Sequence, residues 1–130
     1  MGTASTMACI TETLGMALPG TAAIPAIHAD RLRAAEASGA QAVHLAQIER
    51  DKQLTPKKII TPASVENALR ILLAVGGSTN AIIHLTAIAG RRGIPIPLQQ
   101  LNKLSDETPV LFDLKPTGDH YMEDLFKAGG

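Results

Sequence analysis

Two apolar helical stretches joined by a glycine pair constrain the fold of this chain most strongly. The first is expected to begin at Thr61-Pro62, because threonine is a good N-cap and proline is tolerated at the first helical position. Gly76-Gly77 ends it, and Ser78 is expected to cap a second helix over residues 79–91. The pattern therefore predicts a helix–Gly-Gly–helix corner. The buried stripe of the first helix is expected to be Val65, Ala68, Leu69 and Leu72.

The second of these helices is apolar nearly all round. A helix of that kind is expected to be buried on several sides, which is unusual in a small free domain. Its apolar residues are Ala81, Ile82, Ile83, Leu85, Ile88 and Ala89.

Composition supports a helical core. Apolar residues make up 45% of the chain and aromatic residues only 2%, so the core must consist of Ala, Ile, Leu and Val, which suits closely packed helices. Further helices are expected over residues 3–14, 28–50, 98–104 and 121–127, and short strands over 94–98 and 110–114. The predicted fold class is therefore α/β but predominantly α-helical, in a single partial domain over residues 1–130.

The long helix over residues 28–50 is expected to bury one narrow apolar face. A glycine inside a helix costs about 1 kcal/mol relative to alanine, so Gly39 predicts close packing of a neighbour at that point. The residues of this face are Leu32, Ala35, Gly39, Val43 and Ala46.

Charge and cysteine content exclude several classes of protein. Twelve basic and 12 acidic residues give a formal net charge of zero, without a basic stripe, so we expect no nucleic-acid partner. The single cysteine, Cys9, is expected to be a small buried thiol, and it excludes an internal disulfide and a self-contained thiolate metal site. No apolar run approaches a membrane span of roughly 20 residues. We expect a cytoplasmic protein; an N-myristoylation pattern at Gly2 is the one feature that favours a lipid anchor.

The segment Gly76-Gly77-Ser78-Thr79-Asn80 is the strongest candidate for binding chemistry. Two glycines let the chain approach a ligand, and the unpaired amides of a helix N-terminus suit a carboxylate or phosphate. The alternative is a helix corner in which Ser78 only caps. Asn80 and His84 share a helix face, so His84 is either a substrate-orienting or proton-handling group, or a buried histidine hydrogen-bonded to its neighbour.

Five ordered sequence blocks resemble one enzyme family. Together they span essentially all 130 residues, and they are similar in order and spacing to the dihydroxy-acid dehydratase/phosphogluconate dehydratase family. The first block, with Pro19-Gly20 and residues 23–26, resembles the sugar-acid (aldonate) dehydratase branch. The blocks are residues 1–8, 12–20, 66–68, 76–80 with His84-Leu85, and 122–130.

The resemblance implies a reaction and its cofactors. Enzymes of this family dehydrate a 2,3-dihydroxy acid to a 2-keto-3-deoxy acid, with an iron–sulfur cluster as Lewis acid and Mg²⁺ holding the substrate. It implies a small-molecule sugar acid as substrate, a homo-oligomeric parent enzyme, and the family's N-terminal α/β domain as the fold. The cluster cysteines and most magnesium ligands are expected upstream of Met1, and the proposed base serine downstream of Gly130, so no catalytic residue and no metal ligand carries over to this chain.

The residues that do carry over have supporting roles. Gly2, Thr3 and Ser5 are expected to line the wall beside the cluster. Ser78, Thr79 and Asn80 are expected to shape the substrate pocket or to hold that wall, while Cys9 matches no cluster position. We therefore expect an internal fragment of a hydro-lyase that binds no cluster and is inactive alone. The alternative is a non-catalytic helical oligomerisation module derived from the family.

Overall fold

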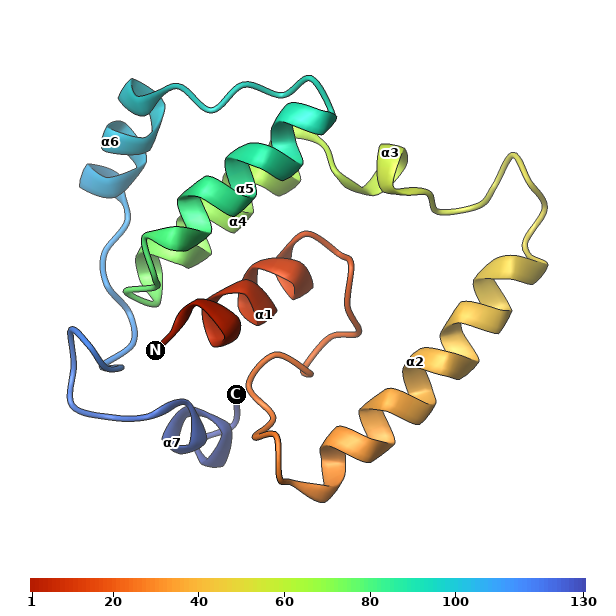
Figure 1. Ribbon diagram of the computed structural model, residues 1–130, viewed down its shortest axis with the longest axis horizontal. Helices are drawn as coiled ribbons and strands as arrows, with labels where there is room; N and C mark the ends of the chain where they lie inside the picture. The colour runs from red at the N-terminus through yellow and green to blue at the C-terminus, as the bar shows by residue number, and fades with distance from the viewer.

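Seven helices connected by loops make up the computed structural model, which describes residues 1–130 (Figure 1). The expected predominantly helical fold class is confirmed. The helices are α1 (Thr3–Thr13), α2 (Ala29–Gln47), α3 (Pro56–Ile59), α4 (Pro62–Ala74), α5 (Asn80–Arg91), α6 (Leu98–Glu107) and α7 (Met122–Lys127).

The two expected short strands do not form. Residues 94–97 run without regular structure into α6. In the 110–114 segment, the N–H groups of Leu111 and Phe112 donate to the carbonyl oxygen of Ala74, at 2.8 and 3.4 Å. These two N–H groups therefore provide hydrogen bonds to a carbonyl oxygen at the end of α4, and they are not available to a neighbouring strand. The only β-type pairing is an isolated bridge between Leu114 and His120.

The hydrophobic core lies where α1, α4, α5 and α6 meet. Figure 1 shows α4 and α5 running alongside each other, with α1 next to them. The expected buried stripe of α4 is confirmed, and Ile10 of α1 is fully buried against it. The core residues are Ile10, Leu14, Ile60, Val65, Ala68, Leu69, Leu72, Ala81, Leu85, Ala89 and Leu104.

Helix α5 is buried on one side only within this chain. Ala81, Leu85 and Ala89 are fully buried and share one face. Ile83, on another face, is 69% exposed. Within residues 1–130, the expectation that α5 is covered on several sides is therefore wrong, because no other element of the chain covers its outer face.

Helix α2 lies apart from the packed helices (Figure 1). It extends over 19 residues, slightly shorter than expected, and none of them is buried. Leu32 is 77% exposed and Val43 is 59% exposed. Apart from the backbone of α2 itself, no atom lies within 4 Å of a Cβ built on Gly39, so the close packing predicted at this glycine is not made by any other part of the chain.

Candidate functional site

The corner between α4 and α5 is built by its two glycines. Gly76 has a φ of +59°, and its N–H donates to the carbonyl oxygen of Leu73 at 3.1 Å. The Gly77 N–H donates to the carbonyl oxygen of Leu72 at 3.0 Å, which completes the Schellman ending of α4. A Cβ on Gly77 would lie 2.7 Å from Cγ2 of Thr6. Glycine at this position therefore lets the corner approach α1 closely.

Thr6 connects α1 to this corner. It is fully buried, and its hydroxyl accepts a hydrogen bond from the Ser78 N–H at 3.0 Å. The same hydroxyl donates to the carbonyl oxygen of Gly2 at 2.9 Å. We did not predict this role, and the sequence carries no signal for it, because a threonine inside a helix does not reveal which backbone group it meets.

Thr3, Ser78 and Asn80 extend the connection toward the surface. The Thr3 and Ser78 hydroxyl oxygens are 3.1 Å apart, and Asn80 Nδ2 donates to Thr3 Oγ1 at 3.0 Å. Ser78 Oγ accepts from the Asn80 N–H at 3.3 Å, so its hydroxyl does bind the first amide of α5, although the N-cap position itself is Thr79 and not the predicted Ser78. We call Thr3, Thr6, Ser78 and Asn80 the polar cluster. It brings together two sequence blocks that are more than 70 residues apart.

Other predicted site residues lie outside the polar cluster. Ser5 Oγ donates locally to the carbonyl oxygen of Gly2 at 3.2 Å, and Gly2 itself is exposed. Thr79 is also exposed. The Ser78 and Asn80 N–H groups already donate within the chain, and the Thr79 N–H is left without a partner at the start of α5. The helix start thus offers an anion fewer free amides than expected.

A small cavity of about 190 Å³ lies at this corner. Residues 76–79 line it, together with Leu72, Leu73 and Ile82 of the two flanking helices and Thr117 from the C-terminal part of the chain. Thr117 Oγ1 would lie 2.6 Å from a Cβ on Gly76, so this side also depends on glycine.

His84 does not pair with Asn80. The Asn80 side chain donates to Thr3 instead, and His84 is exposed. The interpretation of His84 as a buried histidine hydrogen-bonded to its neighbour is therefore wrong. Nothing in the chain orients its imidazole.

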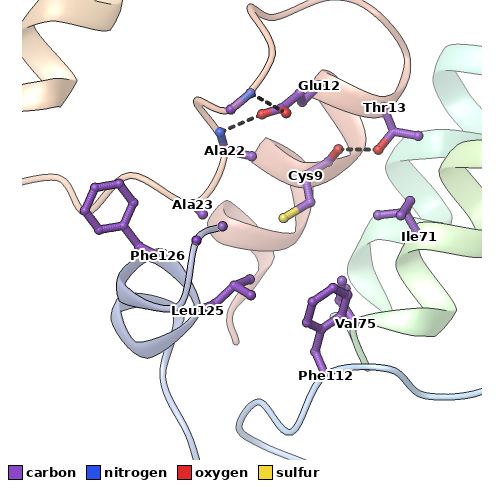
Figure 2. Close-up of a pocket in the computed structure, with 13 residues that line it drawn as sticks. Cys9, Glu12, Thr13, Ala22, Ala23, Ile71, Val75, Phe112, Leu125 and Phe126 are labelled. Carbon is purple, nitrogen blue, oxygen red and sulfur yellow. Dashed lines mark hydrogen bonds between the residues drawn. The ribbon is translucent and has the colours of Figure 1, made fainter.

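A larger cavity of about 500 Å³ surrounds Cys9 (Figure 2). Figure 2 shows the thiol on α1 facing a mainly apolar lining that includes Val75 just after α4, Phe112, and Leu125 of α7. Cys9 is half-buried, where the sequence predicted a buried thiol. Burial, with a further contribution from the negative charge of Glu12, raises the pKa of Cys9 above its usual range.

Glu12 fixes the loop that follows α1. Its two carboxylate oxygens accept hydrogen bonds from the N–H groups of Gly20 and Ala22, both at 2.7 Å (Figure 2). We did not predict this role, although the sequence carries a signal for it. A glutamate in the last turn of a helix is disfavoured by the helix dipole, so a specific partner is expected.

The side chains of this chain do not fit an iron–sulfur cluster or a magnesium ion. No group of three or more His, Cys, Asp or Glu side chains is placed to hold a metal ion. Cys9 is the only thiol, and it lies among apolar side chains. None of the helices combines the length and hydropathy that crossing a bilayer requires.

Comparison with known proteins identifies relatives of the whole chain. The family model for the N-terminal part of dihydroxy-acid/6-phosphogluconate dehydratases matches residues 1–130. Three of the similar curated proteins, each named dihydroxy-acid dehydratase, illustrate the match. The identity is 50% over 98% of this chain for Methanospirillum hungatei, 49% over 100% for Caldicellulosiruptor saccharolyticus, and 46% over 100% for Thermodesulfovibrio yellowstonii.

The matched region is a minor part of these relatives. The chain spans 23% of the length of each of the three proteins. The family model and the matches along the whole of this chain confirm the resemblance to the dehydratase family that the sequence blocks indicated. The chain therefore belongs to the dihydroxy-acid/6-phosphogluconate dehydratase family and corresponds to part of the N-terminal region of its members.

Proposed function

We propose that this chain is part of a hydro-lyase that dehydrates a 2,3-dihydroxy acid to a 2-keto-3-deoxy acid, with sugar acids as the substrate class. The polar cluster carries the proposal. It connects residues 3–6, which are expected beside the iron–sulfur cluster, to residues 78–80, which are expected to shape the substrate pocket or to hold that wall. The names of the relatives support the reaction, and the first sequence block supports the sugar-acid branch.

In this proposal the chain supplies the wall of the site. Gly2, Thr3 and Ser5 lie at its N-terminal end, beside the metal site of the parent enzyme. The Asn80 side chain donates a 3.0 Å hydrogen bond to the Thr3 hydroxyl, and this bond positions the start of α5 against α1. The unpartnered Thr79 N–H and the cavity at residues 76–79 are the groups available to a substrate oxygen.

The metal ligands must come from other parts of the parent protein. The donor set of residues 1–130 does not fit either group, and this chain covers 23% of its relative from M. hungatei. We therefore assign the iron–sulfur cluster and Mg²⁺ to the remainder of the parent, and to this chain a non-catalytic structural role. Residues 1–130 are then one partial domain of a cytoplasmic enzyme. Only 16 of the 130 residues are buried, which supports further polypeptide covering this surface.

A chimeric enzyme tests the proposal. The segment of the M. hungatei dehydratase that matches this chain is replaced by residues 1–130, and keto-acid formation is measured with a dihydroxy acid and with a sugar acid. We expect an active, cluster-loaded chimera whose sugar-acid turnover exceeds that of the unmodified host. The 130-residue chain alone, after anaerobic reconstitution, is expected to show neither iron–sulfur absorption nor keto-acid formation.

Substitutions in the chimera test the role of the polar cluster. Thr3→Val and Asn80→Leu remove the hydrogen bond between α1 and α5, and we expect each to lower kcat at least about tenfold with cluster absorption retained. Thr86→Val, on the exposed side of α5, is the matched control and should leave kcat unchanged. Cluster-loaded Thr3→Val and Asn80→Leu chimeras with full activity would refute the role of these residues, and an unchanged substrate preference would refute the sugar-acid assignment.

A further inference from the structure

A tight turn over residues 113–120 borders the small cavity at the α4–α5 corner. Its Thr117 lines this cavity of about 190 Å³ together with residues 76–79. The turn also contacts the N-terminal end of the chain, because the Met1 amino group donates to the carbonyl oxygen of Lys115. Three segments that are far apart in the sequence therefore meet at this corner.

The turn holds Thr117 in a fixed place. The Gly118 N–H donates to the carbonyl oxygen of Leu114 at 2.8 Å, and the Asp113 carboxylate accepts the Asp119 N–H at 2.9 Å. A Cβ on Gly118 would lie 2.4 Å from the carbonyl carbon of Asp113, so the turn closes this tightly only with glycine there. Leu114 is buried and anchors the turn in the interior.

The cavity offers one hydrogen-bond acceptor and one donor. The Thr117 hydroxyl donates to the carbonyl oxygen of Leu114 at 3.3 Å, which uses its proton and leaves its oxygen able to accept. Thr117 is exposed, so a ligand can reach it. The Thr79 N–H has no acceptor in the chain. The Ser78 hydroxyl, in contrast, is already hydrogen-bonded to Thr3.

This lining fits a neutral hydroxyl group better than an anion or an alkyl group. No ionisable side chain lines the cavity. A carboxylate oxygen has no proton to donate to Thr117 Oγ1, and a methyl group would leave both polar groups unpaired. A hydroxyl both donates and accepts, so it satisfies Thr117 and Thr79 together. The remaining lining is glycine and the apolar side chains of Leu72, Leu73 and Ile82, which suit the carbon that bears the hydroxyl.

We propose that this cavity binds a hydroxyl of the sugar acid beyond C3, and that Thr117 determines specificity for it. Thr117 Oγ1 accepts the proton of this hydroxyl, and the Thr79 N–H donates to its oxygen. In the proposed reaction the hydroxyls at C2 and C3 are held at the metals, whereas the cavity offers only neutral groups. The assignment rests on the proposed function and adds the part of the substrate that distinguishes a sugar acid from an alkyl dihydroxy acid.

The chimera of the M. hungatei enzyme with residues 1–130 tests the role of Thr117. The substrates are straight-chain aldonates of four to six carbons and 2,3-dihydroxybutanoate, which has no hydroxyl beyond C3. Thr117→Val removes the acceptor at nearly constant volume, and we expect it to raise KM at least about fivefold for one or more aldonates. The KM for 2,3-dihydroxybutanoate should stay unchanged, and so should kcat for both kinds of substrate, because the lost contact does not involve the reacting atoms.

Two further variants separate binding by the Thr117 hydroxyl from support of the fold. Thr117→Ser keeps the hydroxyl and should restore the aldonate KM. Thr86→Val, on the exposed side of α5, is the matched control and should change neither KM. An aldonate KM that is unchanged in Thr117→Val, or that serine does not restore, would overturn the proposal. Equal changes for both kinds of substrate would also overturn it, because they would mean that Thr117 only supports the fold or contacts another segment of the parent.

Failure of the proposed function gives a different result. A chimera with Thr117 that turns over no aldonate would refute the sugar-acid reaction. The dissociation constants of the aldonates, measured by calorimetry on the cluster-loaded chimera, then provide the same comparison. A constant that rises in Thr117→Val and recovers in Thr117→Ser supports the hydroxyl site, and equal constants in all three proteins would refute it.

Discussion

The buried hydroxyl of Thr6 is a single-residue link between α1 and the α4–α5 corner. Replacing it with the isosteric valine leaves the Ser78 N–H without its 3.0 Å partner, and an unsatisfied buried amide costs about 1–3 kcal/mol. We expect Thr6→Val to lower the free energy of unfolding by that amount in urea titrations. Thr11→Val is the control, because the Thr11 hydroxyl donates only to Met7 within α1, and its effect should be below about 0.5 kcal/mol. Equal losses in the two variants would contradict this role of Thr6.

Because of Cys9, the free energy of unfolding of the chain is expected to fall at alkaline pH. Burial raises the pKa of this thiol, so the native chain holds the thiol proton more tightly than the unfolded chain does. The contribution to stability is therefore complete below the pKa of an unfolded cysteine, about 8.5, and is lost as the pH rises through the higher native value.

Unfolding of wild type and Cys9→Ala between about pH 7 and pH 10 measures this effect. We expect the free energy of unfolding of wild type to fall relative to that of Cys9→Ala above about pH 8.5. Parallel pH profiles would show that the thiol titrates alike in the native and unfolded chain.

At the scale of single elements, the start of α4 is the best-defined local signal. Thr61 Oγ1 accepts the Ser64 N–H at 3.2 Å, and Ser64 Oγ accepts the Thr61 N–H at 2.8 Å, which forms a capping box. Thr61→Ala should lower the free energy of unfolding by about 1 kcal/mol in urea titrations. Thr55→Ala is the matched control, since Thr55 precedes α3 without a capping hydrogen bond and should change stability little. A similar loss at Thr55 would mean that the capping box contributes nothing specific.

Helix boundaries could be predicted from the sequence because their signals are local. The cap at Thr61, the glycine ending at Gly76 and the apolar period of α4 all act within a few residues of the chain. The strands expected over 94–98 and 110–114 were wrong because a strand forms only with a partner. The N–H groups of Leu111 and Phe112 instead donate to the carbonyl oxygen of Ala74 at the end of α4.

At the scale of the whole molecule, stability is expected to be uneven. Helix α4 contributes five buried residues and α2 contributes none. Hydrogen exchange should therefore find the α2 amides exchanging much faster than those of α4, since local opening of α2 exposes almost no apolar surface. Equal protection of the two helices would contradict the packing described here.

The candidate site shows where sequence reasoning reached its limit. The family blocks identified Thr3, Ser78 and Asn80, but not that they touch one another, nor that Thr6 lies beneath them. Those contacts join residues more than 70 positions apart, and no local pattern encodes them. Glu12 could have been found from its unfavourable place at a helix C-terminus, whereas Thr6 could not.

The sequence by itself determined the helical content, the α4–α5 corner and the family, because caps, glycines, apolar periods and motif order are all read along the chain. Only the tertiary structure decided which faces are covered. It showed that α5 is buried on one side, that α2 lies apart, and that the polar cluster joins the two family blocks. An amphipathic pattern indicates that one face of a helix is to be buried. Which element buries it depends on packing between segments that are distant in the sequence.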